Sequence, residues 1–221
     1  MAVTKTPPPL FLQAGAALLV AAAAIASPLA APPANAADCN DVEVVFARGT
    51  GEPPGIGRVG DAFVNDLRGL IGDRSMGVYA VNYPASYDFL AAANGANDAS
   101  AHIQWVANNC PNTRIVLGGY SQGAAVVDVV AAIPVPGIGF NNPLPPFAGD
   151  KIAAIAVFGN PSTKIGLPLT SSPVFGARAI DICNPGDPIC SNGDNSSVMA
   201  HRSYGPDGTA GQAAYFVANR L

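Results

Sequence analysis

Short apolar runs alternate with longer amphipathic segments through most of the chain. The first run, residues 42–47 (Val-Glu-Val-Val-Phe-Ala), is rich in β-branched and aromatic residues and is followed at once by Arg-Gly-Thr-Gly. A run of this composition, closed by a glycine-rich turn, predicts a buried β-strand. Similar runs, each closed by a Gly, Pro or Asn signal, recur at residues 78–82, 114–117, 152–158 and 178–182.

Helical periodicity separates these predicted strands. Small and apolar residues repeat at helical spacing in three segments, which are 59–71, 99–106 and 124–132. Strands that alternate with helices predict parallel β-α-β units, and therefore an α/β sandwich of about five parallel strands with helices on both faces. The Pro- and Gly-rich stretch 134–149 interrupts the alternation. Because strand patterning resumes directly after it, we expect an ordered surface loop within one domain.

The first 36 residues differ in composition from the rest. Residues 10–31 are mostly Ala, Leu, Val, Ile and Phe; one Lys precedes this run, and the small-x-small sequence Ala-Asn-Ala at 34–36 follows it. This pattern predicts a secretory signal peptide, residues 1–36. An uncleaved membrane anchor is the alternative, since the run approaches spanning length. Prolines at 28, 32 and 33 and the lack of a basic cluster after the run favour cleavage.

The remaining segment, residues 37–221, is long enough for one domain with a sizeable core and short for two. Hydrophobic residues make up 49% of the chain and charged residues 12%, which excludes a disordered chain. The net charge is −4 and the 11 Lys and Arg residues are scattered, so no basic face is available for nucleic acid or for an anionic membrane surface. We expect a monomer with no membrane-spanning segment after signal cleavage.

Export would place the four cysteines, Cys39, Cys110, Cys183 and Cys190, in an oxidising compartment. An even count there predicts two disulfides, for which three pairings are open. A metal site is the alternative. The spacing of six residues between Cys183 and Cys190 matches no common zinc motif, and the chain has only 2 histidines, so we expect no metal.

Residues 119–123 (Gly-Tyr-Ser-Gln-Gly) form a G-x-S-x-G motif between the predicted strand 114–117 and the predicted helix 124–132. The motif presents a nucleophilic serine in this strand-turn-helix context. The glycines leave room for a crowded turn, Ser121 projects beyond the sheet edge, and the helix N-terminus faces the reacting carbonyl. An ordinary glycine-rich turn is the alternative, and the context favours the nucleophile.

A serine alcohol is a poor nucleophile at neutral pH, so it needs a general base and an acid that orients the base. Only His102 and His201 can be that base. In this fold the acid and then the histidine follow the serine in the chain, which selects His201. His102 lies in a helical segment, where we expect a structural or surface role.

Five aspartates lie between Ser121 and His201, at positions 128, 150, 181, 187 and 194. Asp187 lies just past the C-terminal end of the last predicted strand, where the active sites of open α/β sheets gather. Asp128 belongs to the helix after the serine, and Asp150 begins a strand at the opposite end of the sheet. Position therefore favours Asp187, with the capping of a turn as the alternative role.

Residues 55–60 (Gly-Ile-Gly-Arg-Val-Gly) match the G-x-G-x-x-G pattern of dinucleotide sites. The first glycine stands well after the strand ends rather than in its turn, and the second predicted strand lacks the acidic residue that would bind ribose. We therefore interpret these glycines as a flexible loop that enters the helix at Val59, and we expect no nucleotide cofactor.

Four motifs follow one another along the domain: Ala-Arg-Gly-Thr at 47–50, the serine motif, Cys-Asn-Pro-Gly-Asp-Pro-Ile-Cys at 183–190, and His201 followed by Tyr-Gly-Pro-Asp at 204–207. In this combination the chain resembles the cutinase family, small secreted serine esterases of the α/β-hydrolase class. The resemblance covers nearly the whole mature chain. It implies a catalytic triad of Ser121, Asp187 and His201, with no cofactor.

The resemblance also implies an oxyanion hole formed by the backbone N–H groups of Thr50 and Gln122. Many relatives carry Ser where this chain has Thr50, and both offer a hydroxyl that can support the hole. The disulfides that the resemblance implies are Cys39 to Cys110 and Cys183 to Cys190.

One departure concerns the substrate. Cutinases carry an apolar flap along the acyl crevice just before the histidine, whereas residues 191–197 (Ser-Asn-Gly-Asp-Asn-Ser-Ser) are polar. Val198 and Met199 are the only sizeable apolar residues there, so we expect an apolar wall from residues 83–90 or from residues 134–147. Asn195 begins a glycosylation sequon, which suits an exposed loop.

Together these observations predict a secreted or envelope-associated serine esterase for short- to medium-chain acyl esters, and for lipids or polyesters. One alternative is a long-chain lipase or phospholipase. The other is a catalytically silent binding or antigenic protein of the cell envelope. The ordered triad pattern argues against a silent site, although a fold alone does not guarantee an activity.

Overall fold

The structure is a computed structural model that describes residues 1–4, 39–132, 137, 139–193 and 197–221. The predicted signal peptide lies almost entirely outside the described residues, and so does the predicted sequon at Asn195. Within the described ranges, no helix has the length and apolarity needed to cross a membrane.

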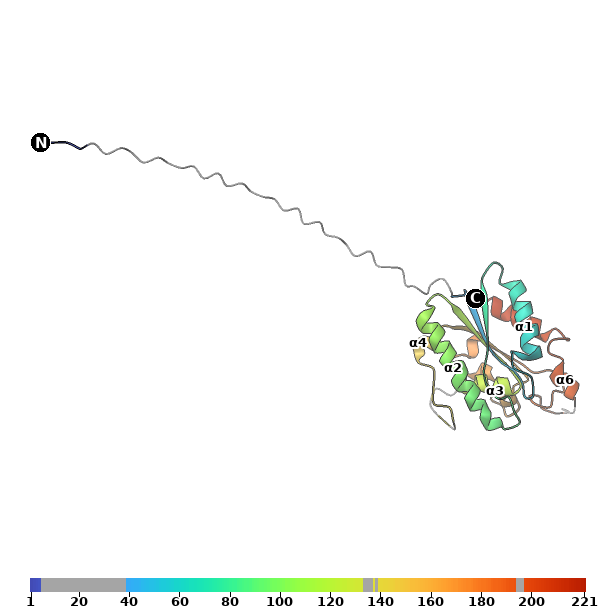
Figure 1. Cartoon of the computed structure of the whole chain (residues 1–221). Coiled ribbons are helices and arrows are strands. Elements are labelled where there is room, and N and C mark those ends of the chain that lie inside the picture. Colours follow the sequence, from blue (N-terminus) through green and yellow to red (C-terminus); the bar gives the residue numbers. More distant parts are fainter. Residues whose placement is uncertain (5–38, 133–136, 138, 194–196) are drawn as a thin grey trace. The chain divides into compact units, whose positions relative to one another are not determined.

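Five parallel strands form one sheet in the order β2-β1-β3-β4-β5 (Figure 1). Their bounds are β1 Val42–Ala47, β2 Met76–Ala80, β3 Arg114–Tyr120, β4 Ile152–Phe158 and β5 Ala179–Ile182. The predicted five-stranded parallel sheet is therefore confirmed. Strand β3 extends beyond the predicted residues 114–117, because Gly118 pairs with Phe46 of β1. A Cβ on Gly118 would lie 2.5 Å from the Phe46 side chain. Glycine is depleted in β-strands, so the strand pattern in the sequence does not extend over this part of β3.

Helices cover both faces of the sheet (Figure 1). One face carries α1 (Gly57–Leu70) and α7 (Thr209–Ala218), and the other carries α2 (Ala92–Asn109) and α3 (Gln122–Ala132). Successive side chains of β1 point to opposite faces, so Phe46 packs beneath α1 and α7 and its neighbour Val45 packs beneath α2 and α3. The sequence pattern does not predict α7, because its buried residues are mainly alanines, whose apolar period is weak.

Shorter helices occupy the connections: η1 Phe89–Ala91, α4 Pro146–Gly149, α5 Pro161–Lys164, η2 Leu169–Ser171, η3 Gly176–Arg178 and α6 Val198–Arg202. The described part of the predicted loop 134–149 is anchored to α2. Asn97 Nδ2 donates to the Gly139 carbonyl at 2.8 Å, and Asn97 Oδ1 accepts from the Asn141 N–H at 3.0 Å.

Two disulfides connect distant and local parts of the fold. Cys39–Cys110 joins the segment before β1 to the end of α2, and Cys183–Cys190 closes the loop that follows β5. This is the pairing that the resemblance implies.

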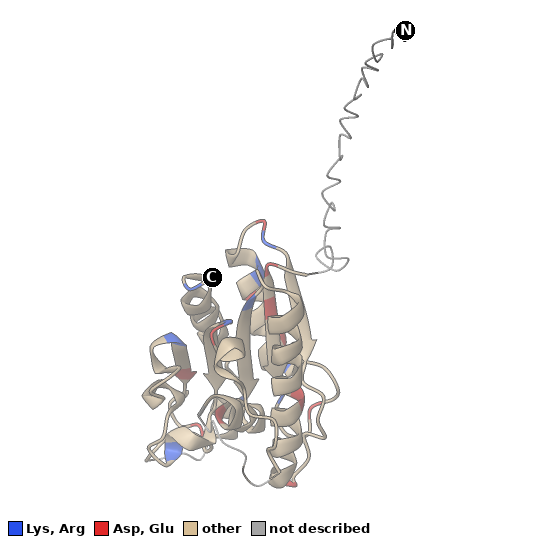
Figure 2. Cartoon of the chain, turned by 90° about the vertical axis from the view of Figure 1, so that its left-hand side faces the viewer, with Lys and Arg blue, Asp and Glu red and all other residues tan. Residues whose placement is uncertain are grey.

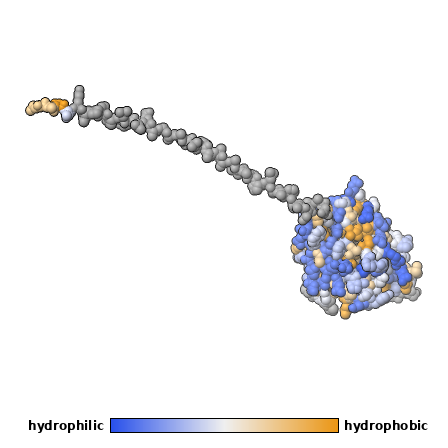
Figure 3. All heavy atoms as spheres, viewed as in Figure 1, coloured by the Kyte–Doolittle hydropathy of each residue, from blue (hydrophilic) through white to orange (hydrophobic). Residues whose placement is uncertain are grey.

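The described surface carries few charges. Lys, Arg, Asp and Glu are scattered over the elements in Figure 2, and the face shown in Figure 3 is largely hydrophilic with apolar patches between. Among the described residues, three charged side chains are instead buried: Arg48 is 5% exposed, Asp128 is 9% exposed and Asp187 is 0% exposed.

Candidate active site

Ser121 occupies a strained turn between β3 and α3. Its φ is 58°, in the left-handed region that residues other than glycine rarely adopt. Its N–H donates to the Phe158 carbonyl of β4 at 2.9 Å. A Cβ on Gly119 would lie 2.2 Å from the Gly123 carbonyl oxygen, and a Cβ on Gly123 would lie 1.9 Å from that of Ala47. Both glycines of the motif are therefore sterically required, and the turn holds Ser121 at the C-terminal edge of the sheet.

His201 lies in the short helix α6, and its Nε2 is 2.9 Å from Ser121 Oγ. The Tyr120 hydroxyl donates to the His201 carbonyl at 2.6 Å, and the two rings lie 4.9 Å apart. Gly159, with a φ of 59°, makes room for the imidazole, because a Cβ there would lie 2.8 Å from His201 Cε1. Contacts to the backbone of His201 and to its ring thus both position the imidazole.

Asp187 is fully buried and accepts three hydrogen bonds. Its Oδ2 lies 2.7 Å from His201 Nδ1 and accepts from the Tyr204 hydroxyl at 2.5 Å, while its Oδ1 accepts from the Ile189 N–H at 2.7 Å. Burial by itself would raise the pKa of Asp187, but these hydrogen bonds, above all that with His201, hold the pKa below its usual value. The side chain is therefore a carboxylate at neutral pH.

The loop that carries Asp187 is tied to the segment that carries His201. Buried Asn184 donates from Nδ2 to Asp207 Oδ2 at 2.6 Å, and its N–H donates to the Tyr204 hydroxyl oxygen at 3.2 Å. The neighbouring disulfide closes the same loop. Acid and imidazole are therefore held at a fixed separation.

Thr50 and Gln122 lie beside each other, although 72 positions separate them in the chain. Thr50 Oγ1 donates to Gln122 Oε1 at 3.1 Å, and Gln122 Nε2 donates to the Ser86 carbonyl at 3.0 Å. Among the described residues, the backbone N–H groups of Thr50 and Gln122 donate to no protein acceptor. Both N–H groups are thus free to bind an oxygen of a ligand.

A cleft of about 670 Å³ opens to solvent beside these groups. Its lining includes Thr50, Ser121 and His201 together with the apolar side chains of Tyr87, Phe89, Ile189 and Val198. Tyr87 is 83% exposed and Phe89 is 65% exposed, so they stand on the rim. Of the two segments expected to supply an apolar wall, residues 83–90 do so in this cleft.

The chain matches the cutinase family model over residues 38–221. It belongs to the cutinase family. Phospholipase Culp4 of Mycobacterium tuberculosis is 59% identical over 207 residues, which cover 93% of this chain and 89% of the relative. Carboxylesterase Culp1 of Mycobacterium bovis is 46% identical over 224 residues, which cover 98% of each chain.

Two solved structures extend this likeness to the fold. A cutinase of Trichoderma reesei in complex with a phosphonate inhibitor is 37% identical, with a TM-score of 0.67 over 82% of this chain and 76% of that one. The catalytic core of acetyl xylan esterase from the same organism is 26% identical, with a TM-score of 0.69 over 83% and 100%. The chain is accordingly a carboxylic ester hydrolase of the serine type.

Tyr204 is the site residue to which sequence reasoning assigns no role. It is fully buried, and its hydroxyl contacts the same Asp187 oxygen as His201. A signal is present in the sequence, since Tyr204 stands three positions after His201 in the family motif. A buried tyrosine hydroxyl needs a hydrogen-bond partner, which in this family member is the carboxylate.

Arg48 supports the Thr50 loop from within the fold. Its Nε donates to the Glu52 carbonyl at 2.9 Å and its Nη2 donates to the Tyr83 carbonyl at 2.7 Å. The loop before α1 is thereby joined to the segment that leaves β2.

The carboxylate of Glu52 lies against the glycine-rich segment 55–60. Glu52 Oε2 accepts from the Gly49 N–H at 2.7 Å, and Glu52 Oε1 accepts from the Arg58 N–H, in the first turn of α1, at 3.0 Å. A Cβ on Gly57 would lie 2.2 Å from Glu52 Oε2. Glu52 therefore takes the anion position at the N-terminus of α1 that a phosphate would need. Helix α1 also begins at Gly57, slightly before the predicted Val59.

His102 lies away from the cleft. Its ring stacks on Tyr79 with centroids 3.6 Å apart, and its Nε2 is 2.8 Å from Glu43 Oε1. These contacts tie α2 to β1 and β2, which is a structural role.

Buried Asp128 and partly buried Asp181 form a separate cluster. Asn160 Nδ2 donates to Asp128 Oδ1 at 3.2 Å and to Asp181 Oδ2 at 2.9 Å. Asp150 is exposed at the end of α4, before β4. Within the described ranges, no group of three or more His, Cys, Asp or Glu side chains is arranged to hold a metal ion.

Proposed function

We propose that Ser121 is the nucleophile of this ester hydrolase, with His201 as general base and Asp187 as the group that orients the base. The observation that carries the proposal is the unbroken line of contacts from Asp187 Oδ2 through the imidazole to Ser121 Oγ, at 2.7 and 2.9 Å. In the proposed ground state the Ser121 hydroxyl donates to Nε2, and Nδ1–H donates to Asp187.

In the first step Ser121 Oγ attacks the ester carbonyl carbon while His201 Nε2 takes the hydroxyl proton. The resulting oxyanion accepts hydrogen bonds from the backbone N–H groups of Thr50 and Gln122. The C–O bond to the alcohol then breaks, and His201 returns the proton to the leaving oxygen. Water attacks the acyl-enzyme in the same way, which releases the carboxylic acid and restores Ser121.

The substrates proposed are short- to medium-chain acyl esters, including lipid or polyester esters. The cleft is open to solvent, and exposed aromatic side chains stand on its rim at Tyr87 and Phe89, which suits apolar acyl groups. Residues 191–193 of the segment before His201 are polar, unlike the apolar flap expected of cutinases.

Phospholipid hydrolysis is a second candidate, for two reasons. The 59% identical relative is named a phospholipase. In addition, Arg58 and Arg202 line the cleft and are both exposed, so they can pair with a phosphodiester next to the scissile ester.

We also propose that residues 1–36 are a signal peptide and that the mature monomer, residues 37–221, works outside the cytoplasm or in the cell envelope. The two disulfides support export, because they persist in oxidising compartments. N-terminal sequencing of the exported chain should begin at Ala37. A chain that starts at Met1 would contradict the proposal.

The deciding experiment is hydrolysis of p-nitrophenyl butyrate by residues 37–221, with both disulfides formed, beside the Ser121→Ala variant. We expect turnover in the wild type and a loss of about 10³-fold or more in the variant. A correctly folded wild type without activity would favour the silent binding protein.

The phospholipid candidate is tested by adding phosphatidylcholine vesicles and the Arg58→Ala and Arg202→Ala variants. Loss of phospholipid turnover with retained butyrate turnover would support it.

A further inference from the structure

A second apolar cavity, of about 330 Å³, adjoins the candidate active-site cleft. Its lining is formed by Phe89, Leu90, Ala92, Ala93, Val129, Gly137 and Phe140. Phe89 lines both the cavity and the cleft that holds Ser121. The two spaces are therefore neighbours across a single exposed side chain.

Helix α3 connects Ser121 to this cavity. Ala125 and Val129, four residues apart, lie on one side of the helix, and Ser121 stands in the turn directly before its first residue, Gln122. All three are partly exposed, whereas Val126, at an intermediate position, is buried. With a rise of 1.5 Å per residue, Val129 lies ~12 Å along the helix axis from Ser121. An extended hydrocarbon chain attached at Ser121 can span that distance.

The side chains that line the cavity are hydrocarbon. The loop that carries Phe140 uses its polar backbone groups elsewhere: Asn97 binds the Gly139 carbonyl and the Asn141 N–H, and Ser100 Oγ donates to the Asn142 carbonyl at 2.5 Å. The Phe140 ring is 2% exposed and Leu90 is 72% exposed, so the cavity has a buried floor and an open apolar lip. A ligand that fits this lining is apolar and elongated.

We propose that this cavity receives the distal part of the acyl chain of an ester whose carbonyl is bound at Ser121. The inference rests on the proposed function of Ser121 and adds to it a determinant of chain length, at Val129 and Leu90. Described residues of both segments expected from sequence to supply an apolar wall line this cavity, since Leu90 belongs to residues 83–90 and Phe140 to residues 134–147. Medium-chain acyl esters are the matching substrate class.

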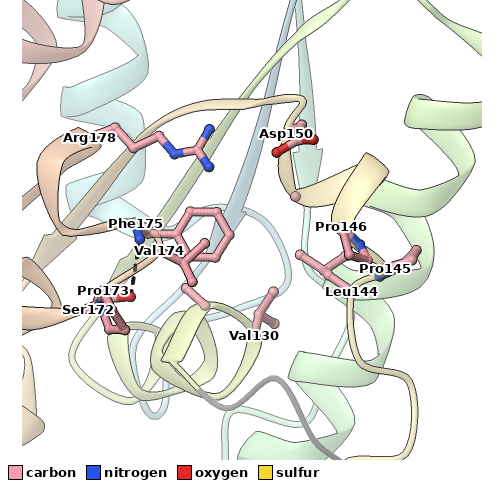
Figure 4. Close-up of a pocket in the computed structure, with 12 residues that line it drawn as sticks. Val130, Leu144, Pro145, Pro146, Asp150, Ser172, Pro173, Val174, Phe175 and Arg178 are labelled. Atoms are coloured by element: carbon pink, nitrogen blue, oxygen red, sulfur yellow. Dashed lines mark hydrogen bonds between the residues drawn. The ribbon is translucent and has the colours of Figure 1, made fainter.

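A different apolar pocket serves as an internal control. It is lined by Val130, Val174, Phe175 and Arg178, among others, and it shares no residue with the active-site cleft (Figure 4). Val174 is 62% exposed, so it tolerates replacement without repacking of the core. The same substitutions at Val129 and Val174 therefore separate the filling of the proposed acyl cavity from a general effect of a larger apolar side chain.

The test is a chain-length series of p-nitrophenyl esters from butyrate to dodecanoate with the wild type, Val129→Phe, Leu90→Ser and Val174→Phe. In the wild type, kcat/KM should rise by about fourfold for each methylene that enters the cavity, and then level off. Val129→Phe fills the cavity and should lower the dodecanoate-to-butyrate ratio by about tenfold or more. Leu90→Ser removes the lip at an exposed position and should lower the ratio by a few-fold. Val174→Phe should leave the profile unchanged.

Binding of dodecanoate to the Ser121→Ala variant, measured by titration calorimetry, tests the cavity without catalysis. We expect binding that weakens by about tenfold when Val129→Phe is added. The proposal is overturned if folded Val129→Phe keeps both the wild-type chain-length profile and the dodecanoate affinity. Failure of the catalytic proposal has a different signature, because butyrate turnover would then be absent while dodecanoate binding still responded to Val129→Phe.

Discussion

Asp187 and Asp128 are both buried carboxylates on this fold, and their surroundings drive their pKa values in opposite directions. Three donors surround Asp187 and lower its pKa despite its complete burial. Within the part of the chain that the structure describes, Asp128 accepts from Asn160 at one oxygen and its Oδ2 has no hydrogen-bond partner. Burial raises the pKa of Asp128 to about 6, and the nearby Asp181 carboxylate adds to the shift. The number of donors, more than depth, therefore decides which buried acid stays charged.

The difference matches the two positions in the fold. Asp187 lies in a disulfide-closed loop at the C-terminal edge of the sheet, where a fixed negative charge can orient an imidazole. Asp128 lies on the inner side of α3, where a carboxylate gains little from being charged. Exchanging each carboxylate for its amide should thus harm activity in one case and help stability in the other.

The largest expected effect is that of Asp187→Asn. The amide cannot hold Nδ1–H of His201 in the same way, so we expect kcat for p-nitrophenyl butyrate to fall by on the order of 10³- to 10⁴-fold. Asp128→Asn is the matched control and should retain kcat. Comparable activity losses in both variants would refute the assignment of the acid to Asp187.

Removing the disulfides tests whether the Asp187 loop depends on covalent closure. The Cys39–Cys110 bridge joins positions 71 apart and the Cys183–Cys190 bridge joins positions 7 apart, which predicts losses of ~4.4 and ~2.5 kcal/mol in unfolding free energy. We expect the double Cys→Ser variant of the short bridge to lose turnover as well, because Asp187 loosens. The long-bridge variant should lose only stability. Unchanged turnover in a less stable Cys183→Ser/Cys190→Ser variant would show that the hydrogen bonds alone hold the loop.

Asp128→Asn should increase stability at neutral pH. The folded chain keeps the Asp128 proton up to about pH 6, whereas the unfolded chain releases it near pH 3.8, so wild-type stability falls as the pH rises through this window. An asparagine stays neutral throughout. The variant should therefore gain on the order of 2–3 kcal/mol over the wild type above about pH 6, and progressively less toward pH 4. Denaturant titrations at several pH values measure this difference; a gain that does not change with pH would point to a cause other than ionisation.

Tyr204→Phe should have the smallest effect. Loss of one of the three donors lets the pKa of Asp187 rise toward its usual value, and a hydrogen bond to a charged group contributes about 1.5–3 kcal/mol. We expect kcat to fall by about tenfold with KM nearly unchanged, because the substrate does not touch Tyr204. Steady-state kinetics decide between this positioning role and a purely structural one, in which stability would fall and kcat would not.

Much of the fold and of the site follows from local signals. The β-branched runs and the helical periods predict five parallel strands and the three central helices, because each pattern extends over a few residues and depends on burial of one face. The turn at Ser121 is local only in part: Gly119 is required by a clash with Gly123 inside the turn, whereas Gly123 is required by the close approach of Ala47 at the end of β1. Strand β3 is longer than predicted and α7 is not predicted, because glycine and alanine leave weak periodic signals.

Local patterns in the sequence are enough to specify the sheet, the strained serine turn and the chain order of serine, aspartate and histidine. The donors around each buried carboxylate depend instead on packing between distant segments, which brings Tyr204 to Asp187 and Asn160 to Asp128. Packing likewise brought Phe140 and Val129, from separate segments, to the same cavity. The two kinds of information differ in how far along the chain they act. Propensity and periodicity act between near neighbours in the chain. A hydrogen bond or an apolar contact between distant segments forms only after packing has brought them to within a few ångströms.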